Sequence, residues 1–123
     1  MSEIDLGEFH LSQHGGSETM WKSENFGEQI GGSRVGRFSL EVGHRYPQHL
    51  HTGGREAISV ISGRLGVIIG GGEEAVDYIL EPGKMVIVEP NQAHLVYNVG
   101  ADPVEGYAFM VITQIGGKTE VLE

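Results

Sequence analysis

Three side chains that can bind a metal ion lie close together in the middle of the chain. They are His49, His51 and Glu56, within the stretch from Gly43 to Gly63. In an extended strand, residues two apart project from the same face, so the two histidines would point together. A turn over 52–55 would then let the chain reverse and bring Glu56 back toward them. The spacing therefore predicts a candidate metal site.

A fourth candidate ligand, His94, lies far downstream in the strand-like stretch AHLVYN. Three neutral imidazoles and one carboxylate suit one divalent first-row ion such as iron, manganese, nickel, copper or zinc. The alternative is that all four are ordinary polar residues of surface loops. However, the run after Glu56 is rich in Ile and Val, as a buried strand would be. Burying these groups without partners is costly, and a metal ion removes that cost.

The composition indicates one globular domain built from short strands. The chain has 123 residues, of which 39% are hydrophobic, so it can form one core but not two. Twenty glycines and four prolines are scattered along it, which is typical of many tight turns. The absence of cysteine excludes disulfides, thiolate ligands and thiol nucleophiles.

Charge and hydropathy limit the partners and the location. A net charge of −9 argues against nucleic acid and against an anionic membrane surface. The first residues lack the basic and apolar regions of a signal peptide, and no apolar run approaches about 18 residues. We therefore expect a cytoplasmic protein.

Alternating or β-branched runs separated by Gly, Pro and Asn turns predict seven or eight short strands. They are expected at 34–42, around His49 and His51, and at 57–61, 65–69, 76–80, 85–88, 93–99 and 104–113. This pattern, with no convincing helix, indicates an all-β sandwich or jelly-roll barrel over 34–113.

The two ends of the chain are less readable. Residues 1–33 predict an arm with one or two short strands that covers the barrel or pairs with a second subunit. His10 and His14 in this arm are expected to be surface residues. Residues 114–123 are expected to form a C-terminal tail.

The chain resembles the cupin family in two motifs. The first, G-x5-H-x-H-x4-E-x6-G, is matched at every fixed position, namely Gly43, His49, His51, Glu56 and Gly63. The second, G-x5-P-x-G-x2-H-x3-N, is matched at Gly83, His94 and Asn98. Glu89 replaces its proline, and Asn91 replaces its internal glycine. Asn is the best non-glycine residue for a positive φ, so the latter change is mild.

This resemblance implies a small single-domain cupin whose fold is a double-stranded β-helix, the jelly-roll barrel. It also implies that His49, His51, Glu56 and His94 hold one metal ion, and that the protein is a homodimer. Cupins have many activities, so the reaction has to be inferred from the site itself.

Four protein ligands on an ion that prefers five or six leave one or two positions for a substrate. Candidates for a separate catalytic base are Tyr46, Tyr107, His44 and Glu41. By the two-residue period, Ile58, Val60 and Val96 follow the ligands inward. They either line a pocket for a small, partly hydrophobic ligand or simply fill the barrel.

The preferred hypothesis is a mononuclear metalloenzyme acting on a small oxygenated organic molecule. A dioxygenase-type reaction is slightly favoured over isomerase or lyase chemistry. The alternatives are a non-catalytic cupin that binds a small molecule and a structural cupin whose metal ion only stabilises the barrel.

Overall fold

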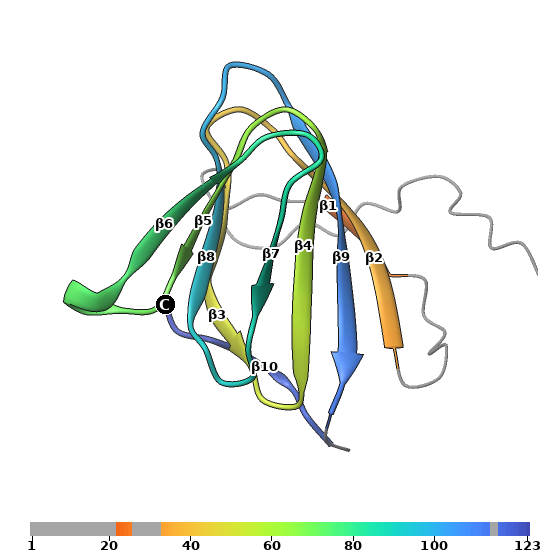
Figure 1. Ribbon diagram of the computed structural model, residues 1–123, viewed down its shortest axis with the longest axis vertical. Coiled ribbons are helices and arrows are strands. Elements are labelled where there is room, and N and C mark those ends of the chain that lie inside the picture. The colour runs from red at the N-terminus through yellow and green to blue at the C-terminus, as the bar shows by residue number, and fades with distance from the viewer. Residues whose placement is uncertain (1–21, 26–32, 114–115) are drawn as a thin grey trace, which may run out of the picture.

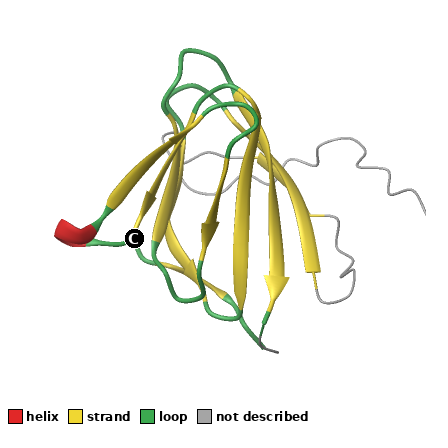
Figure 2. Ribbon diagram, viewed as in Figure 1, coloured by secondary structure: helices red, strands yellow, loops and turns green. Residues whose placement is uncertain are grey.

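The computed structural model describes residues 22–25, 33–113 and 116–123. The interpretation of His10 and His14, and of most of the arm, falls outside these residues. Within the described ranges, the regular structure consists of β-strands and one short 3-10 helix, η2 (Gly72–Glu74), as Figure 2 shows. No helix in this part of the chain is long and apolar enough to cross a membrane.

The strands form two five-stranded antiparallel sheets that pack face to face (Figure 1). In spatial order, sheet A consists of β1 (Lys22–Asn25), β2 (Ser33–Leu40), β9 (Val104–Ile112), β4 (Gly54–Ser62) and β7 (Met85–Val88). Sheet B consists of β10 (Thr119–Val121), β3 (Arg45–His51), β8 (His94–Asn98), β5 (Leu65–Ile69) and β6 (Val76–Leu80). The prediction of an all-β jelly-roll barrel is confirmed.

The hydrophobic core lies between the two sheets and follows from the alternation along each strand. In β4, Ile58 and Val60 face inward and are buried, whereas Arg55 and Ile61 are exposed. Burying each such aliphatic side chain stabilises the fold by roughly 1.5–3 kcal/mol. The buried hydrophobic residues are Leu40, Ile58, Val60, Leu65, Val67, Ile69, Leu80, Val88, Val96 and Val104.

Most strand positions agree with the pattern of the sequence, and the differences have local causes. The strand expected at 34–42 ends at Leu40, because a turn follows in which Gly43 has a φ of 79°. Such a φ is easy only for glycine. The strand β10 was not predicted, and it lies within the expected C-terminal tail.

Candidate metal centre

Strands β3 and β8 bring two of the candidate ligands face to face. His49 of β3 lies directly opposite His94 of β8, and their ring centroids are 4.0 Å apart. His51 lies two residues further along β3, with its ring centroid 4.9 Å from that of His49. The expectation that His49 and His51 project together agrees with this arrangement.

The fourth candidate ligand comes from the opposite sheet. Glu56 of β4 places Oε1 3.3 Å from Nε2 of His94 and Oε2 3.5 Å from Nε2 of His51. One ligand atom from each of the four side chains lies within 4.8 Å of the others. Two atoms bound to one first-row ion can be at most about 4.2 Å apart, because each bond is about 2.1 Å long. The widest separation would therefore have to shorten from 4.8 Å to at most about 4.2 Å for the cluster to close around an ion.

The cluster is buried, but one side reaches the surface. His94 is 0% exposed and His49 is 3% exposed, whereas the side chains of His51 and Glu56 retain 11% and 13%. The cluster is therefore closest to the surface at His51 and Glu56.

The hydrogen bonds of the rings determine which nitrogen is available to an ion. Nδ1 of His49 lies 2.8 Å from the carbonyl oxygen of Pro47, and Nδ1 of His94 lies 3.0 Å from that of Gln92. A carbonyl oxygen can only accept, so Nδ1 donates in both cases and Nε2 keeps its lone pair. Ligand histidines in metalloproteins are held in this way.

The remaining ring nitrogens indicate that the cluster fits a cation. Nε2 of His51 and Nε2 of His94 are buried and have no hydrogen-bond partner. Each faces a carboxylate oxygen of Glu56. For neutral His94, whose Nδ1 donates to Gln92, the lone pair of Nε2 then points at a lone pair of the carboxylate. Such an arrangement is unfavourable unless a positive charge lies between them. The four side chains are therefore able to hold a metal ion.

Both shifted pKa values keep the ligands in the form that a metal ion needs. Burial by itself raises the pKa of Glu56, but the neighbouring His51 and His94 imidazoles outweigh it and lower the pKa to about 2. Burial, followed by the nearby His94, lowers the pKa of His49 to about 3. At neutral pH the carboxyl group is therefore ionised and the His49 ring is neutral, as metal binding requires.

A family model described as "Cupin domain" matches residues 36–113. The chain belongs to the cupin family. The resemblance seen in the two motifs is thereby confirmed. No protein with curated information matches the sequence at a significant level.

Solved structures share the fold of this cupin at low sequence identity. A conserved protein with a double-stranded β-helix domain from Klebsiella pneumoniae is 21% identical, with a TM-score of 0.67, covering 87% of this chain and 88% of that one. A structure of DMSP lyases is also 21% identical, with a TM-score of 0.75 and coverages of 94% and 62%. An oxalate oxidase in complex with glycolate is 21% identical, with a TM-score of 0.64 and coverages of 71% and 45%. The cupin thus spans less than half of that oxidase, and these likenesses show the fold alone.

A bulge brings Tyr46, one of the four candidate bases, to the metal centre. Tyr46 pairs with Val96 and His49 pairs with His94, so β3 has one residue more than β8 between these pairs. The extra residue is accommodated around Pro47, which cannot donate a ladder hydrogen bond. Residues three apart thereby reach the same face, and the rings of Tyr46 and His49 meet edge to face at 4.1 Å. Burial, and then the charge of Glu56, raise the pKa of Tyr46 to about 12.

The other three candidate bases lie away from the cluster. Tyr107 pairs with Ser59 on β4. Ser59 is three residues from Glu56, and because side chains alternate between the faces, Ser59 and Tyr107 lie on the outer face of sheet A. The carbonyl of His44 accepts a hydrogen bond from the backbone of Asn98, four residues along β8 from His94, or about 13 Å. Glu41 lies in the same turn as His44, at that opposite end of the barrel.

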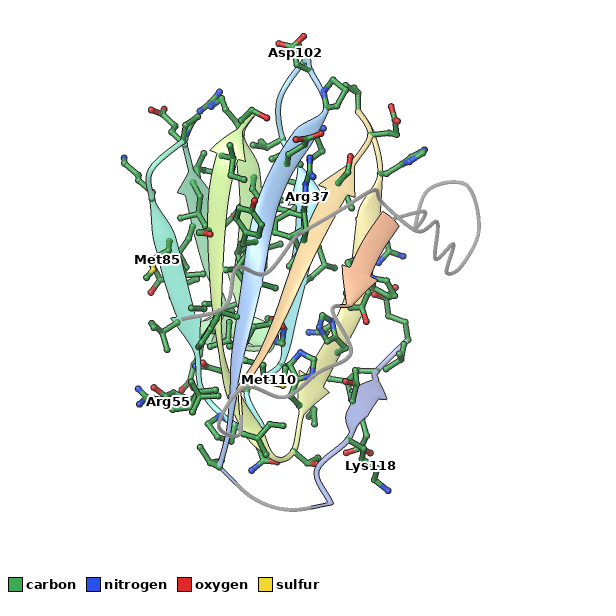
Figure 3. The ribbon with its side chains drawn as sticks, turned by 90° about the vertical axis from the view of Figure 1, so that its right-hand side faces the viewer. Arg37, Arg55, Met85, Asp102, Met110 and Lys118 are labelled. Atoms are coloured by element: carbon green, nitrogen blue, oxygen red, sulfur yellow. The ribbon has the colours of Figure 1, made fainter. Side chains whose placement is uncertain are left out.

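The second-motif turn connects the two ligand strands. Asn91 has a φ of 64°, which confirms that asparagine can replace the motif's glycine here. Its backbone N–H donates to the carbonyl of His51 at 2.8 Å. The motif asparagine, Asn98, has a different role, because its side chain bonds the backbone of Leu40, Gly100 and Asp102. Asp102 lies at the top of the barrel in Figure 3.

The three residues expected to line a pocket face inward, but only Ile58 and Val96 are two residues from a ligand, whereas Val60 is four residues, or about 13 Å, from Glu56. Ile58, Val60 and Val96 are 2%, 3% and 8% exposed and belong to the hydrophobic core. Their contact with a small molecule stays a prediction.

Two residues near the cluster were missed from the sequence. Met110 pairs with Glu56 across β9 and β4, so it lies on the same inner face; Figure 3 labels it. The run VEGYAFMVI has apolar residues on both faces, so its alternation does not show which residues face the core. Thr119 of β10 contacts His51, with Oγ1 2.9 Å from Nδ1. No motif or period marks this contact.

Proposed function

We propose that this cupin binds one divalent transition metal ion and acts as a metalloenzyme on a small oxygenated organic molecule. Nε2 of His49, His51 and His94 and the carboxylate of Glu56 would be the ligands. The observation that supports the proposal is the pair of buried, partnerless Nε2 atoms facing a buried carboxylate. Three neutral imidazoles and one negative charge leave a divalent ion with a net charge of about +1, which favours an anionic or enolate oxygen as a further ligand.

The residues around the cluster support a small substrate. It would approach past His51 and Glu56, where the centre reaches the surface. Met110 and the inward aliphatic residues would exclude water and contact its apolar part. Tyr46 would hold a proton at its phenolic oxygen, because its pKa of about 12 keeps it protonated at neutral pH. It therefore suits a hydrogen-bond donor or general acid better than a resting general base.

The ion, when bound, would supply a Lewis acid or a redox centre. We place an oxygen-dependent reaction slightly ahead of isomerase or lyase chemistry. Structural relatives are described as an oxalate oxidase and as DMSP lyases, so the fold accommodates both kinds of reaction. The glycolate in the oxidase complex supports including small hydroxy- and dicarboxylates among the candidate substrates.

A structural cupin is the second candidate. It is favoured by Ile58, Val60 and Val96, because these side chains are almost fully buried and fill the barrel beneath the ligands. In this case the ion would only connect the two sheets.

The decisive experiment begins with metal analysis of the protein from its native host. Oxygen uptake would then be followed with diketones, catechol-like compounds and small carboxylates, and product formation would be followed without oxygen. Stoichiometric iron and turnover with one of these classes, lost in His94→Gln, would support the enzyme. Tightly held zinc that binds no added carboxylate, with no turnover, would support the structural cupin. Protein that takes up no transition metal would overturn both.

A further inference from the structure

The strand β10 lies against the strand that contains two of the ligands. Thr119 pairs directly with His51, and Val121 pairs with His49. Directly opposite residues have their side chains on the same face. The Thr119 hydroxyl thus reaches Nδ1 of His51, at 2.9 Å.

His51 differs from the other two histidines in how its ring is held. His49 and His94 each bond the carbonyl of the residue two positions earlier in their own segment. Those partners are backbone groups only two residues away, so they move together with the ligand. Among the described ligands, His51 depends instead on a side chain 68 positions away. A hydroxyl can accept as well as donate, so Thr119 can accept the hydrogen bond of the Nδ1 proton of His51 and leave Nε2 with its lone pair.

The segment around Thr119 is fixed to β3 at both ends. On one side, Thr52 and Lys118 exchange hydrogen bonds that include the Thr52 hydroxyl, and a Cβ on Gly117 would overlap the backbone of Gly53. On the other side, the carboxylate of Glu123 accepts from the side chain of Arg45 at 2.6 Å and from the backbone of Gln48. Lys118 lies beside β10 in Figure 3. The hydroxyl of Thr119 is thus presented to His51 by an exposed strand that is attached to β3 on both sides.

We propose that Thr119 is a positioning residue of the metal centre, whose hydroxyl holds the His51 ring with Nε2 facing the ion. The inference rests on the proposed metal binding. Without the hydroxyl, Nδ1 of His51 would lose its partner. The ring could then rotate, or carry its proton on Nε2, from which Glu56 Oε2 is 3.5 Å away. Either change would remove the lone pair that binds the ion.

The test compares three variants of the full chain. Thr119→Val removes the hydroxyl and keeps the shape, in a strand where valine is favourable. Thr119→Ser restores a hydroxyl without the methyl group. Thr52→Val is the matched control, because it removes a hydroxyl that joins the same two segments but contacts no ligand ring.

Cobalt(II) is the probe, since its visible spectrum reports the ligand set while a competing chelator reports the affinity. We expect Thr119→Val to bind cobalt about 10- to 100-fold more weakly, the range for the loss of an outer partner of a ligand histidine. Its spectrum should change, and Thr119→Ser should return both toward the parent. Thr52→Val should lower the melting temperature while the affinity stays within a factor of about two of the parent. In the metal-free protein, the ring nitrogen shifts of His51 should show its proton moving off Nδ1 only in Thr119→Val.

Each other outcome overturns the inference in a distinguishable way. Unchanged affinity and spectrum in Thr119→Val would remove the positioning role and leave the metal site intact. Equal weakening in Thr52→Val would show that attachment of the segment, and not the hydroxyl, determines the affinity. A parent protein that binds no cobalt would overturn the metal site and this inference together. If Thr119→Val does not fold, failure of the folded Thr119→Ser to keep the parent spectrum would contradict the inference.

Discussion

The carboxylate of Glu56 lies 3.3 Å from Nε2 of His94, and these two residues belong to opposite sheets of the barrel. A metal ion between them would join sheet A to sheet B, as well as β3 to β8. The four ligands are therefore expected to act as a set, and losing one should affect the whole centre.

We expect His94→Ala to lower metal occupancy sharply, because His94 is fully buried and is the only described ligand from β8. The loss should exceed the roughly 100-fold that removal of an outer partner can cost. Metal content after dialysis measures it, with His94→Gln as a second variant that fills more of the space. His44→Ala is the control, since His44 lies at the other end of the barrel. Equal metal content in His94→Ala and the parent would place the ion elsewhere.

Removal of the ion should lower the melting temperature without unfolding the protein. A ligand at one hundred times its dissociation constant stabilises the folded state by about 2.7 kcal/mol, or about 10 °C for a domain of this size. The chelator effect should shrink only as the pH falls toward 3, where protons begin to compete with the ion for His49. Melts at pH 7.5 and 3.5, with and without chelator, measure both effects. A chelator effect as large at pH 3.5 as at pH 7.5 would argue against His49 as a ligand.

The metal-free protein should lose stability in acid. The pKa of His49 is about 3 in the fold and 6.5 ordinarily, so between these values the unfolded chain binds more protons. The stabilisation by neutral His49 is thus complete above pH 6.5 and is lost as the pH falls toward 3. At pH 5 the loss is about 2 kcal/mol, from 1.5 pH units at about 1.36 kcal/mol each. Glu56 adds to it below pH 4.5, because its pKa is lowered to about 2.

Urea unfolding in chelator at pH 7.5 and 5 measures this acid sensitivity. The variant His49→Gln cannot titrate, so its free energy of unfolding should fall less between the two pH values. An equal fall in the variant and the parent would show that His49 is not the group responsible.

Replacing Tyr46 with Phe should separate catalysis from metal binding. The ring contact with His49 is kept, so metal affinity should stay unchanged. Turnover should fall by about 100-fold or more if the phenol donates a proton in the reaction. Kinetics at saturating substrate measure this, and Tyr107→Phe on the outer face is the matched control. Equal rates in Tyr46→Phe and the parent would leave Tyr46 with a packing role.

We expect the protein to form a homodimer through the outer face of sheet A. On this face, Phe109, Ala57 and Ile87 form one row across three strands, next to Met85 and Val111. Four of these side chains are unusually exposed for apolar groups: Met85 57%, Ile87 49%, Val111 43% and Phe109 41%. A clustered apolar face of this kind is typical of an interface.

Sedimentation should therefore give about twice the chain mass of 13.3 kDa. Phe109→Lys should shift the protein toward the monomer, because it buries a charge in the interface. Val76→Lys is the control, since Val76 is 48% exposed on β6 of sheet B. A monomer at every accessible concentration would contradict the dimer. Most of the arm expected over residues 1–33, which was predicted to cover the barrel or pair with a second subunit, lies outside the described residues.

The sequence predicted the elements best where turns with Gly and Pro separate β-branched runs. The strands β5, β6 and β7 begin and end at the expected residues, because Gly63, Gly70–Gly72 and Pro82–Gly83 mark their ends. The four candidate ligands could also be identified, because the motif spacing that marks them is read directly from the sequence. What the two-residue period could not show is the bulge at Pro47, which moves Tyr46 to the ligand face.

Thr119 could not be predicted for a different reason. The strand β10 has three residues with no apolar face, TEV, so no periodicity distinguishes it from a loop. Its position depends on pairing with β3, which is a long-range contact.

The 68 positions between His51 and Thr119 also set an order of events during protein synthesis. At about 5–20 residues per second, the ribosome adds Thr119 roughly 3–14 s after His51. Strand β9, which lies between β2 and β4 in sheet A, ends at Ile112, seven residues before Thr119, so the barrel closes only shortly before Thr119 is added. The ring of His51 then receives its last hydrogen bond after all four ligands have been made. We expect the choice between competing metals to fall to the folded barrel, and hence to the exchangeable metal pool that the folded protein meets.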